Sequence, residues 1–365
     1  MMTSQHTHLQ TNDADSSAIG TGTSIISIQG LTKRYKTFTA VDDIDLEVKA
    51  GEIFGILGPN GAGKTTTLEM IEGLRTPDRG TITVAGLDAV RQPAEVRKVI
   101  GVQLQSTALF QYLSAGELIE LFGHMYGVTQ PRSQVDHLLK LVGLESKAKA
   151  RVEEMSGGQQ QRLGIALALV NQPRVTFLDE PTTGLDPIAR RNLWDTILGV
   201  RDAGTTVVLT THYMEEAEVL CDRIAIMDGG HVIACDTPAG LIRSLDLEGT
   251  VSATIAGAST ATPTAEGTSA LPAVTEHHLA AIPGVTAASL VASEIPPRIT
   301  LQTRDAQVTI IGLLTLASDN GITLGELSST RASLEDVFLN LTGRMYVQPD
   351  APPVEENKRR RRGRR

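Results

Sequence analysis

A glycine-rich turn, placed between an apolar run and a helical pattern, constrains this chain more than any other feature of its sequence. Residues 56–73 read ILGPNGAGKTTTLEMIEG and satisfy the pattern G-x-x-x-x-G-K-[ST] with Gly58, Gly63, Lys64 and Thr65. A plain turn followed by a solvated lysine would need no ligand. A buried strand before the pattern and a helix after it are, however, the context in which it binds phosphate, and both are indicated here.

The residue types of this turn suit a chain of phosphates. Glycines let the backbone curl closely around an anion with its N–H groups pointing inward, and the start of a helix adds partial positive charge. Lys64 can place a full charge on the β- and γ-phosphates, and the hydroxyl of Thr65 can ligate Mg²⁺. We therefore expect nucleotide phosphates to contact the whole loop, which consists of Gly58, Pro59, Asn60, Gly61, Ala62, Gly63, Lys64, Thr65 and Thr66.

An apolar run that ends in two acids supplies a second candidate feature. Residues 174–180 read RVTFLDE, so Asp179 and Glu180 are expected at the carboxyl edge of a sheet, where sites in α/β proteins gather. Asp179 could hold Mg²⁺, and Glu180 could orient or deprotonate an attacking water. Two acids that merely end a strand are common, and only the phosphate loop makes the functional interpretation the better one.

The hydrophobic pattern predicts an α/β fold. Residues 53–57, 175–179, 206–210 and 224–227 are short apolar runs, typical of parallel strands covered on both faces. The stretches ISIQGLTKRY and DIDLEV instead alternate apolar and polar residues and predict antiparallel strands with one solvated face, Ile44, Leu46 and Val48 lying together.

Two helix starts are marked by capping residues. Ser114 and Glu117 form a capping-box pattern, and Asp186 followed by Pro187 predicts another N-terminus. The expected buried faces of these helices consist of Leu118, Leu121, Phe122 and Met125 in the first, and Leu193, Ile197 and Val200 in the second.

Composition limits the class of protein. The chain has 365 residues, 41% of them hydrophobic, which is enough for roughly two domains. It contains no run of about 18 apolar residues, and its first residues are polar, so we expect neither a membrane span nor a secretory signal. The expected location is the cytoplasm, where Cys221 and Cys235 would stay thiols.

Changes in composition along the chain predict its domains. The C-terminal part again alternates strand-like stretches (RITLQT, ITLGEL) with helical ones (AQVTIIGLLTLASDNG, SLEDVFLNLTG), which indicates a small α+β domain. The predicted division is a disordered segment 1–24, a nucleotide-binding domain 25–244, an accessory domain 245–346 with a flexible insertion at 257–274, and a disordered basic tail 347–365.

A signature motif brings a resemblance to a known family. Between the phosphate loop and the stretch FLDEPTTGLDP lies MSGGQQQR, which resembles the signature of the ATP-binding cassette (ABC) family. Ser156 and Gln159 also fit a capping box, and both readings can hold, because a capped helix N-terminus is itself an anion site. Met155 stands where the family usually has leucine.

Further family elements occur in the expected order. The resemblance implies that Tyr35 stacks on adenine, that Gln105 reaches the metal and the attacking water, that Asp186 lies in a dimer-contact loop and that His212 senses the γ-phosphate. It also implies the fold: a P-loop NTPase domain with a mixed parallel core sheet, an antiparallel β subdomain and a helical signature subdomain, followed by the small α+β domain.

The resemblance implies an ATPase that acts as a pair. Each cassette binds ATP and Mg²⁺ at its own loop, with Thr65, Gln105 and Asp179 around the metal and Lys64, Glu180 and His212 as the catalytic residues. The ATP site is completed in trans by the signature residues of a second copy, which here are Ser156, Gly157, Gly158 and Gln159. One copy of each motif per chain therefore implies a homodimer.

The subgroup is indicated by TTHYMEEAEVLCDRIAIMDGG and SLEDVFLNLTG, which resemble stand-alone ATPase subunits of daunorubicin-resistance-type (ABC-2) multidrug exporters. An integral membrane permease would then be a separate chain, and this subunit would be peripheral on the inner face of the cell membrane. Residues 106–126 would grip the permease. The apolar residues of that segment, Leu109, Phe110, Leu118 and Phe122, fit a plain buried helix face equally well.

Two alternatives concern the tail and the function class. The run KRRRRGRR (residues 358–365) is either a solvated charge run or a contact for anionic lipid. A nucleic-acid partner is not favoured, because residues 65–155 lack the sustained heptads of chromosome-acting relatives and the chain has one cassette, whereas ribosome-acting relatives usually have two.

Overall fold

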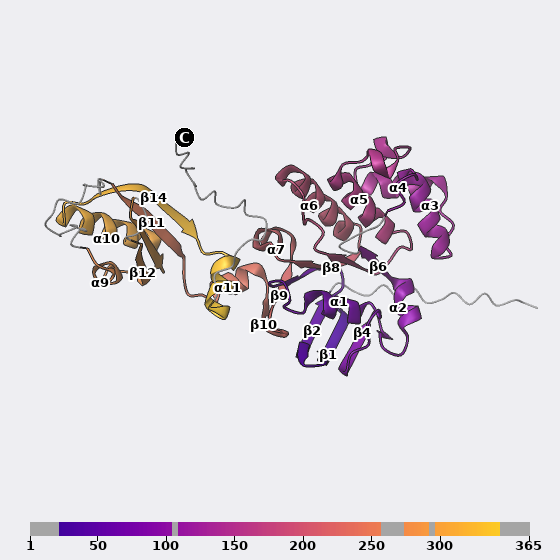
Figure 1. The fold of residues 1–365 in the computed structure, drawn as a ribbon, viewed down its shortest axis with the longest axis horizontal. Helices are drawn as coiled ribbons and strands as arrows, with labels where there is room; N and C mark the ends of the chain where they lie inside the picture. The colour runs from indigo at the N-terminus through magenta and orange to yellow at the C-terminus, as the bar shows by residue number, and fades with distance from the viewer. Residues whose placement is uncertain (1–21, 104–108, 257–273, 292–295, 344–365) are drawn as a thin grey trace, which may run out of the picture.

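The computed structural model describes residues 22–103, 109–256, 274–291 and 296–343. Figure 1 shows a larger part, which we call the body, and a smaller C-terminal sheet to one side of it. Residues 1–21 of the predicted N-terminal segment, most of the predicted insertion, Gln105 and the basic tail lie outside the described residues, and Ser24, the last residue of that segment, begins a strand.

The body is built around a mainly parallel sheet with strand order β10-β9-β3-β8-β7-β6. Only β10 runs antiparallel, to β9. Every residue of β3 and β7 is buried, because α5, α6 and α7 pack on one face of the sheet and α1, α2 and the antiparallel sheet pack on the other. The prediction made from the apolar runs is therefore confirmed. The strands are β3 (Ile53–Leu57), β6 (Ile100–Gln103), β7 (Val175–Asp179), β8 (Thr206–Thr211), β9 (Arg223–Asp228) and β10 (His231–Asp236).

A second, antiparallel sheet of the body has the order β2-β1-β4-β5. Its strands are β1 (Ser24–Tyr35), β2 (Phe38–Lys49), β4 (Arg79–Val84) and β5 (Leu87–Asp88). Ile44, Leu46 and Val48 are buried while the residues between them are exposed, so the predicted alternation is confirmed. Their side chains pack in one core with Phe54 and Ile56 of the parallel sheet.

The helices of the body begin largely where the sequence marks their starts. Ser114 caps α3 in a capping box, and Asp186 accepts hydrogen bonds from the first N–H groups of α6. Leu193, Ile197 and Val200 are buried as predicted. The helices are α1 (Lys64–Ile71), α2 (Pro93–Val99), α3 (Ala115–Met125), α4 (Arg132–Leu141), α5 (Gly157–Ala168), α6 (Pro187–Asp202), α7 (Met214–Leu220) and α8 (Pro238–Arg243), with short 3-10 turns at Glu145–Lys147 and Val152–Glu154.

The predicted buried face of α3 is wrong in part. Leu118 is fully buried, but Met125 is 72% exposed, and the other core positions of the helix are Ala115, Ile119 and Gly123. Small residues at helical spacing let this helix approach its neighbours, so the packed face is rotated from the one marked by the largest side chains.

The C-terminal sheet has the order β12-β13-β11-β14, entirely antiparallel. The sequence analysis found β13 (Arg298–Thr303) and β14 (Thr323–Arg331) but not β11 (Gly249–Ala256) or β12 (Val285–Val291). A separate core under this sheet includes residues of α9 (Glu276–Ala280) and α10 (Ala306–Asp319).

The last helix, α11 (Leu334–Thr342), returns to the body (Figure 1). Leu334, Val337 and Phe338 share a buried cluster with Met214 of α7 and Leu241 of α8. The backbone N–H of Leu334 also donates to the Glu218 carboxylate at 2.7 Å. The C-terminal sheet is therefore connected to the body twice. The chain runs from α8 of the body into β11, and α11, which follows β14, packs against the body.

Candidate functional site

The glycine-rich loop joins the buried strand β3 to helix α1, and its geometry needs glycine. A side-chain carbon at Gly58 would overlap the carbonyl oxygen of Met227 on the neighbouring strand. Gly63, just before α1, has φ 104° and lies against the carbonyl oxygen of Ala40. Only glycine combines this left-handed backbone with so close an approach, so the loop can keep its N–H groups turned to one side.

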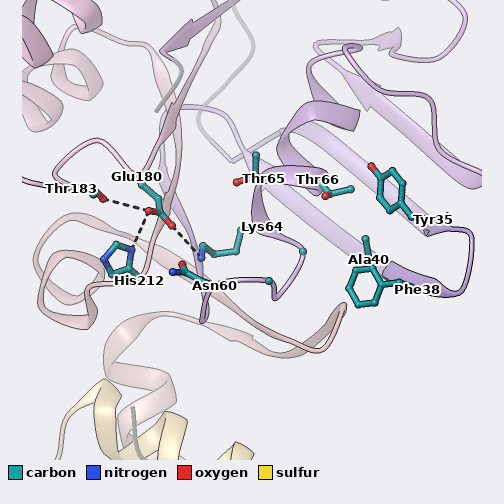
Figure 2. Close-up of a pocket in the computed structure, with 12 residues that line it drawn as sticks. Tyr35, Phe38, Ala40, Asn60, Lys64, Thr65, Thr66, Glu180, Thr183 and His212 are labelled. Carbon is teal, nitrogen blue, oxygen red and sulfur yellow. Dashed lines mark hydrogen bonds and ion pairs between the residues drawn. The ribbon is translucent and has the colours of Figure 1, made fainter. Parts of the chain in front are cut away.

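A cavity of about 520 Å³ lies beside this loop. In Figure 2, Lys64, Asn60, Glu180 and His212 form one wall, and Tyr35 is on the opposite wall. The lining residues are Tyr35, Phe38, Ala40, Asn60, Gly61, Gly63, Lys64, Thr65, Thr66, Glu180, Thr183 and His212. The charged and polar groups are therefore at one end of the cavity, and the aromatic rings are at the other.

Three charged or titratable side chains meet at the polar end. The ammonium of Lys64 lies 3.3 Å from Glu180 Oε1 and donates to the carbonyl oxygens of Gly58 and Pro59 at 2.9 and 3.2 Å. His212 Nδ1 lies 3.2 Å from Glu180 Oε2. The structure thus brings together the three residues that the sequence analysis assigned to catalysis.

The Glu180 carboxyl is held in its ionised form, which is the form that can accept a proton. Its hydrogen bond with His212 and the charge of Lys64 lower its pKa from 4.5 to about 2, against the opposing effect of burial. The residue has φ 47°, and its N–H is fixed by the hydroxyl and the carbonyl of Thr210. Such a backbone persists only where its surroundings hold it, and here it turns the carboxylate toward the cavity.

Asp179 and Thr65 face each other across the sheet edge. The Thr65 hydroxyl lies 3.4 and 3.2 Å from the two Asp179 carboxylate oxygens, and the Thr210 hydroxyl donates to the same carboxylate. Carboxylate and hydroxyl oxygens are the donors that Mg²⁺ prefers. Within the described ranges no three His, Cys, Asp or Glu side chains could hold a metal unaided.

The signature residues lie elsewhere. The predicted capping box is confirmed, with Ser156 N–H donating to Gln159 Oε1 at 3.0 Å and Gln159 N–H to Ser156 Oγ at 3.4 Å. Ser156 and Gly157 are exposed, and neither they nor Gly158 and Gln159 line the cavity. Asp186 is likewise exposed and caps α6. These five residues are not part of the pocket within one chain.

Some residues of the site were missed in the sequence. Phe38 and Ala40 line the cavity, Thr183 donates to Glu180 Oε2 at 3.4 Å, and Thr210 holds Asp179. Thr210 could have been found, because it ends an apolar run two residues before His212 and a parallel neighbour of the 175–179 run would place it opposite Asp179. Phe38 and Ala40 carry no comparable signal.

Proteins of known family share long stretches of this sequence. Residues 41–183 match the family model described as ABC transporter. The linearmycin resistance ATP-binding protein LnrL of Bacillus subtilis (strain 168) is 36% identical over 323 residues, covering 88% of this chain and 99% of LnrL. The chain belongs to the ABC transporter ATPases.

Within this family the chain is similar to the daunorubicin resistance ATP-binding proteins. DrrA2 of Streptomyces coeruleorubidus, a daunorubicin resistance ATP-binding protein, is 35% identical over 328 residues, covering 89% of this chain and 97% of DrrA2. The solved ABC cassette MJ0796, a dimer in a post-hydrolysis state with ADP and Pi, is 29% identical with a TM-score of 0.52, covering 58% of this chain and 98% of that chain. The family, fold and ATPase predictions are therefore confirmed.

None of the helices in the described ranges is both long enough and apolar enough to cross a bilayer.

Proposed function

We propose that this ABC ATPase is the nucleotide-binding subunit of an exporter, and that it powers transport through a separate membrane permease. The observation that carries the proposal is the convergence of Lys64, Glu180 and His212 at the end of the Gly58–Thr65 loop. The names of its relatives, which include resistance and export proteins, support the direction of transport. The transported compound would be chosen by the permease.

The residues of one chain take distinct roles in this proposal. Lys64 leaves the carbonyl oxygens that it contacts and binds phosphate, together with the N–H groups of residues 58–66. Tyr35, which is 37% exposed on the far wall, stacks on the adenine ring. Glu180 accepts the proton of the attacking water, and His212 keeps the carboxylate charged and in place.

The metal role falls to the oxygens of Thr65 and Asp179. Their separation of 3.2 to 3.4 Å lets both reach one cation, and Gln105, which lies outside the described residues, is proposed as a third contact. Mg²⁺ bound there would neutralise charge on the β- and γ-phosphates. Thr210 keeps the Asp179 carboxylate turned toward Thr65.

A homodimer completes the site in this proposal. Ser156, Gly157, Gly158 and Gln159 form an exposed helix N-terminus that makes no contact with the cavity of its own chain. A second copy can present this N-terminus to the phosphates bound at Lys64. The dimeric state of MJ0796 supports this arrangement.

The permease contact is assigned to the surface around α3. Phe110 is 56% exposed and Tyr112 is 77% exposed, whereas Leu109 and Leu118 are buried. Of the four apolar residues named for the groove, Leu109 and Leu118 are buried, Phe122 is partly buried and Phe110 is exposed. Tyr112, which the sequence analysis did not name, adds a second exposed aromatic ring beside Phe110. We place the subunit in the cytoplasm on the inner face of the cell membrane, with anionic lipid as the proposed contact of the basic tail.

The test is purification of the tagged protein from its native membranes in mild detergent, followed by identification of the co-purifying chains. We expect a multi-span protein whose presence changes the ATPase rate. A double variant Phe110→Ser, Tyr112→Ser should lose that partner and keep its basal ATPase, while Leu74→Ser, an exposed apolar control elsewhere on the body, should keep both. Recovery of nucleic acid or ribosomes without a membrane protein would overturn the transport role.

The accessory domain keeps the role that the sequence analysis left as a hypothesis, dimer stabilisation or regulation. Contact between α11 and the body supports an energetic link between the two parts. The domain boundaries and the flexible insertion remain predictions.

A further inference from the structure

Helix α7 carries a buried carboxyl group that the ATPase mechanism above does not use. Glu216 is fully buried, and burial raises its pKa. A carboxyl group in a protein core is destabilising unless polar partners surround it, so its presence there calls for a physical reason. Its neighbour Glu215, one residue earlier on the same helix, is exposed.

The partners of Glu216 come from separate parts of the chain. The indole N–H of Trp194 donates to Glu216 Oε1 at 3.2 Å. The hydroxyl groups of Thr211 and Thr182 and the positive charge of Arg190 all favour the ionised form of the same carboxyl group. Arg190 also lies over the ring of Tyr213, with 4.2 Å between the guanidinium carbon and the ring centroid.

These partners flank the residues of the catalytic site. Thr211 immediately precedes His212, Thr182 is two residues after Glu180, and Trp194 belongs to α6, the helix that Asp186 caps. The Glu180–His212 contact of 3.2 Å joins these two segments. Their relative position therefore also depends on the contacts around Glu216. Glu216 lies on α7, which begins two residues after His212, and its carboxyl group accepts the hydrogen bond from Trp194 of α6.

We propose that Glu216 is a positioning residue, which holds the His212 segment, the loop after Glu180 and helix α6 in one arrangement. It touches no substrate, so its loss should lower the rate of hydrolysis and leave ATP binding nearly unchanged. This inference rests on the proposed roles of Glu180 and His212. The inference adds a link between two parts of the proposed site. The dimer-contact loop, which leads into α6, is connected to the base Glu180 through the carboxyl group of Glu216.

The natural probe is Trp194, because it is the single tryptophan of the chain. Its emission in the full-length protein reports directly on the hydrogen bond to Glu216. The test compares wild type, Glu216→Gln and the matched control Glu215→Gln. For each we would measure kcat and KM for Mg-ATP, the Kd of ATP, the melting temperature, and the Trp194 emission with and without ATP.

Glu216→Gln keeps the shape of the side chain and an acceptor for the indole, but it replaces the second carboxyl oxygen with an NH₂ group, which can only donate hydrogen bonds. We expect kcat to fall roughly 10- to 100-fold, the typical loss when a reacting group is displaced slightly. KM and the Kd of ATP should stay within about twofold, since the phosphate loop is untouched. Trp194 emission should change in the free protein, and Glu215→Gln should resemble wild type throughout.

Two results would overturn the inference. One is a kcat of Glu216→Gln equal to that of the control. The other is a parallel loss of kcat, ATP affinity and melting temperature, which would show a role in stability alone. Trp194→Phe, which removes only the indole donor and some volume, should lower kcat less, and its effect should not add to that of Glu216→Gln. If wild type and control both bind ATP without hydrolysing it, the proposed function fails instead.

Discussion

The body and the C-terminal sheet bury different kinds of polar residue, although both are sheets covered by helices. Among the described residues, the buried charged or titratable side chains of the body include Glu52, Lys64, Glu72, Asp179, His212 and Glu216, whereas the buried polar residues of the C-terminal sheet and its helices are Thr254, Thr303 and Thr309. Two of these threonines, Thr303 and Thr309, are hydrogen-bonded to each other. Thr303 Oγ1 lies 2.6 Å from Thr309 Oγ1, 3.1 Å from the Gly284 carbonyl and 3.0 Å from the Asp305 carbonyl.

The difference shows that the type of buried polar residue distinguishes the region of the candidate site from a region with a structural role. Buried charge destabilises a fold unless it is paired, so buried charged groups cluster at functional sites. A hydrogen-bonded pair of threonines destabilises the fold little and holds a turn in place, so it indicates a structural role alone. The four predictions that follow test whether this contrast holds, beginning with the largest expected effect.

Removing the charge of Glu180 should have the largest effect. Glu180→Gln keeps the volume but loses the base, so ATP turnover should fall by about 10²- to 10⁴-fold while ATP still binds and traps the closed dimer. Steady-state turnover and size-exclusion chromatography with ATP would measure both effects. Glu153→Gln, an exposed control, should behave as wild type. An unaltered rate in Glu180→Gln would show that the base is another group.

Truncating Phe338 should destabilise the body even though the residue lies at the C-terminal end of the described chain. Its ring is 3% exposed in the cluster with Met214 and Leu241, and Phe→Ala in a core typically costs about 3–5 kcal/mol. Thermal and urea unfolding would measure the loss. Leu341→Ala, on the same helix but 44% exposed, should cost far less. Equal effects of the two variants would mean that α11 does not dock on the body in solution.

Glu72 should make the body less stable as the pH rises. Burial, with the charges of Asp179 and Glu69, raises the pKa of this carboxyl group from 4.5 to about 8. The folded state therefore binds more protons than the unfolded state between these values. The stability is full below about pH 4.5 and is lost as the pH rises toward 8, by up to a few kcal/mol.

The measurement is the free energy of unfolding from pH 5 to pH 8 in nucleotide-free protein with EDTA. We expect Glu72→Gln to flatten the decline, because its side chain does not titrate. Glu95→Gln, at an exposed position on α2, should keep the wild-type slope. The same slope in both variants would show that Glu72 titrates normally.

Thr303→Val should have the smallest effect and should be confined to the C-terminal sheet. The change removes the acceptor of the Asp305 N–H and the one hydroxyl proton that the Gly284 and Asp305 carbonyl oxygens share, and it costs about 1–3 kcal/mol. Hydrogen exchange of β13 would detect it, while ATP turnover should not change. Thr300→Val, on the same strand but facing the other side, serves as the control. A loss of turnover in Thr303→Val would contradict the division between chemistry and architecture.

Much of the body follows from sequence pattern because its signals are local. The loop from Gly58 to Thr65 is consecutive in sequence, and the strand before it is apolar throughout. The caps at Ser114, Ser156 and Asp186 are likewise read from residues three positions apart or fewer. Strand β11 was missed because both strands that pair with it lie beyond the 257–274 insertion, so its pattern had no adjacent partner.

The sequence by itself determined which residues are the candidates for phosphate binding and acid–base chemistry, because the phosphate loop, the acidic strand end and the signature are each contiguous. The tertiary structure decided how they meet. In the sheet, Leu57 lies opposite Thr211 and Asp179 opposite Thr210, and only this register brings Lys64, Glu180 and His212 together. The same packing decided that Met125 faces solvent and that Glu216 is buried beneath the site. Burial depends on residues that are close in space but distant in sequence, and a local sequence pattern does not identify them.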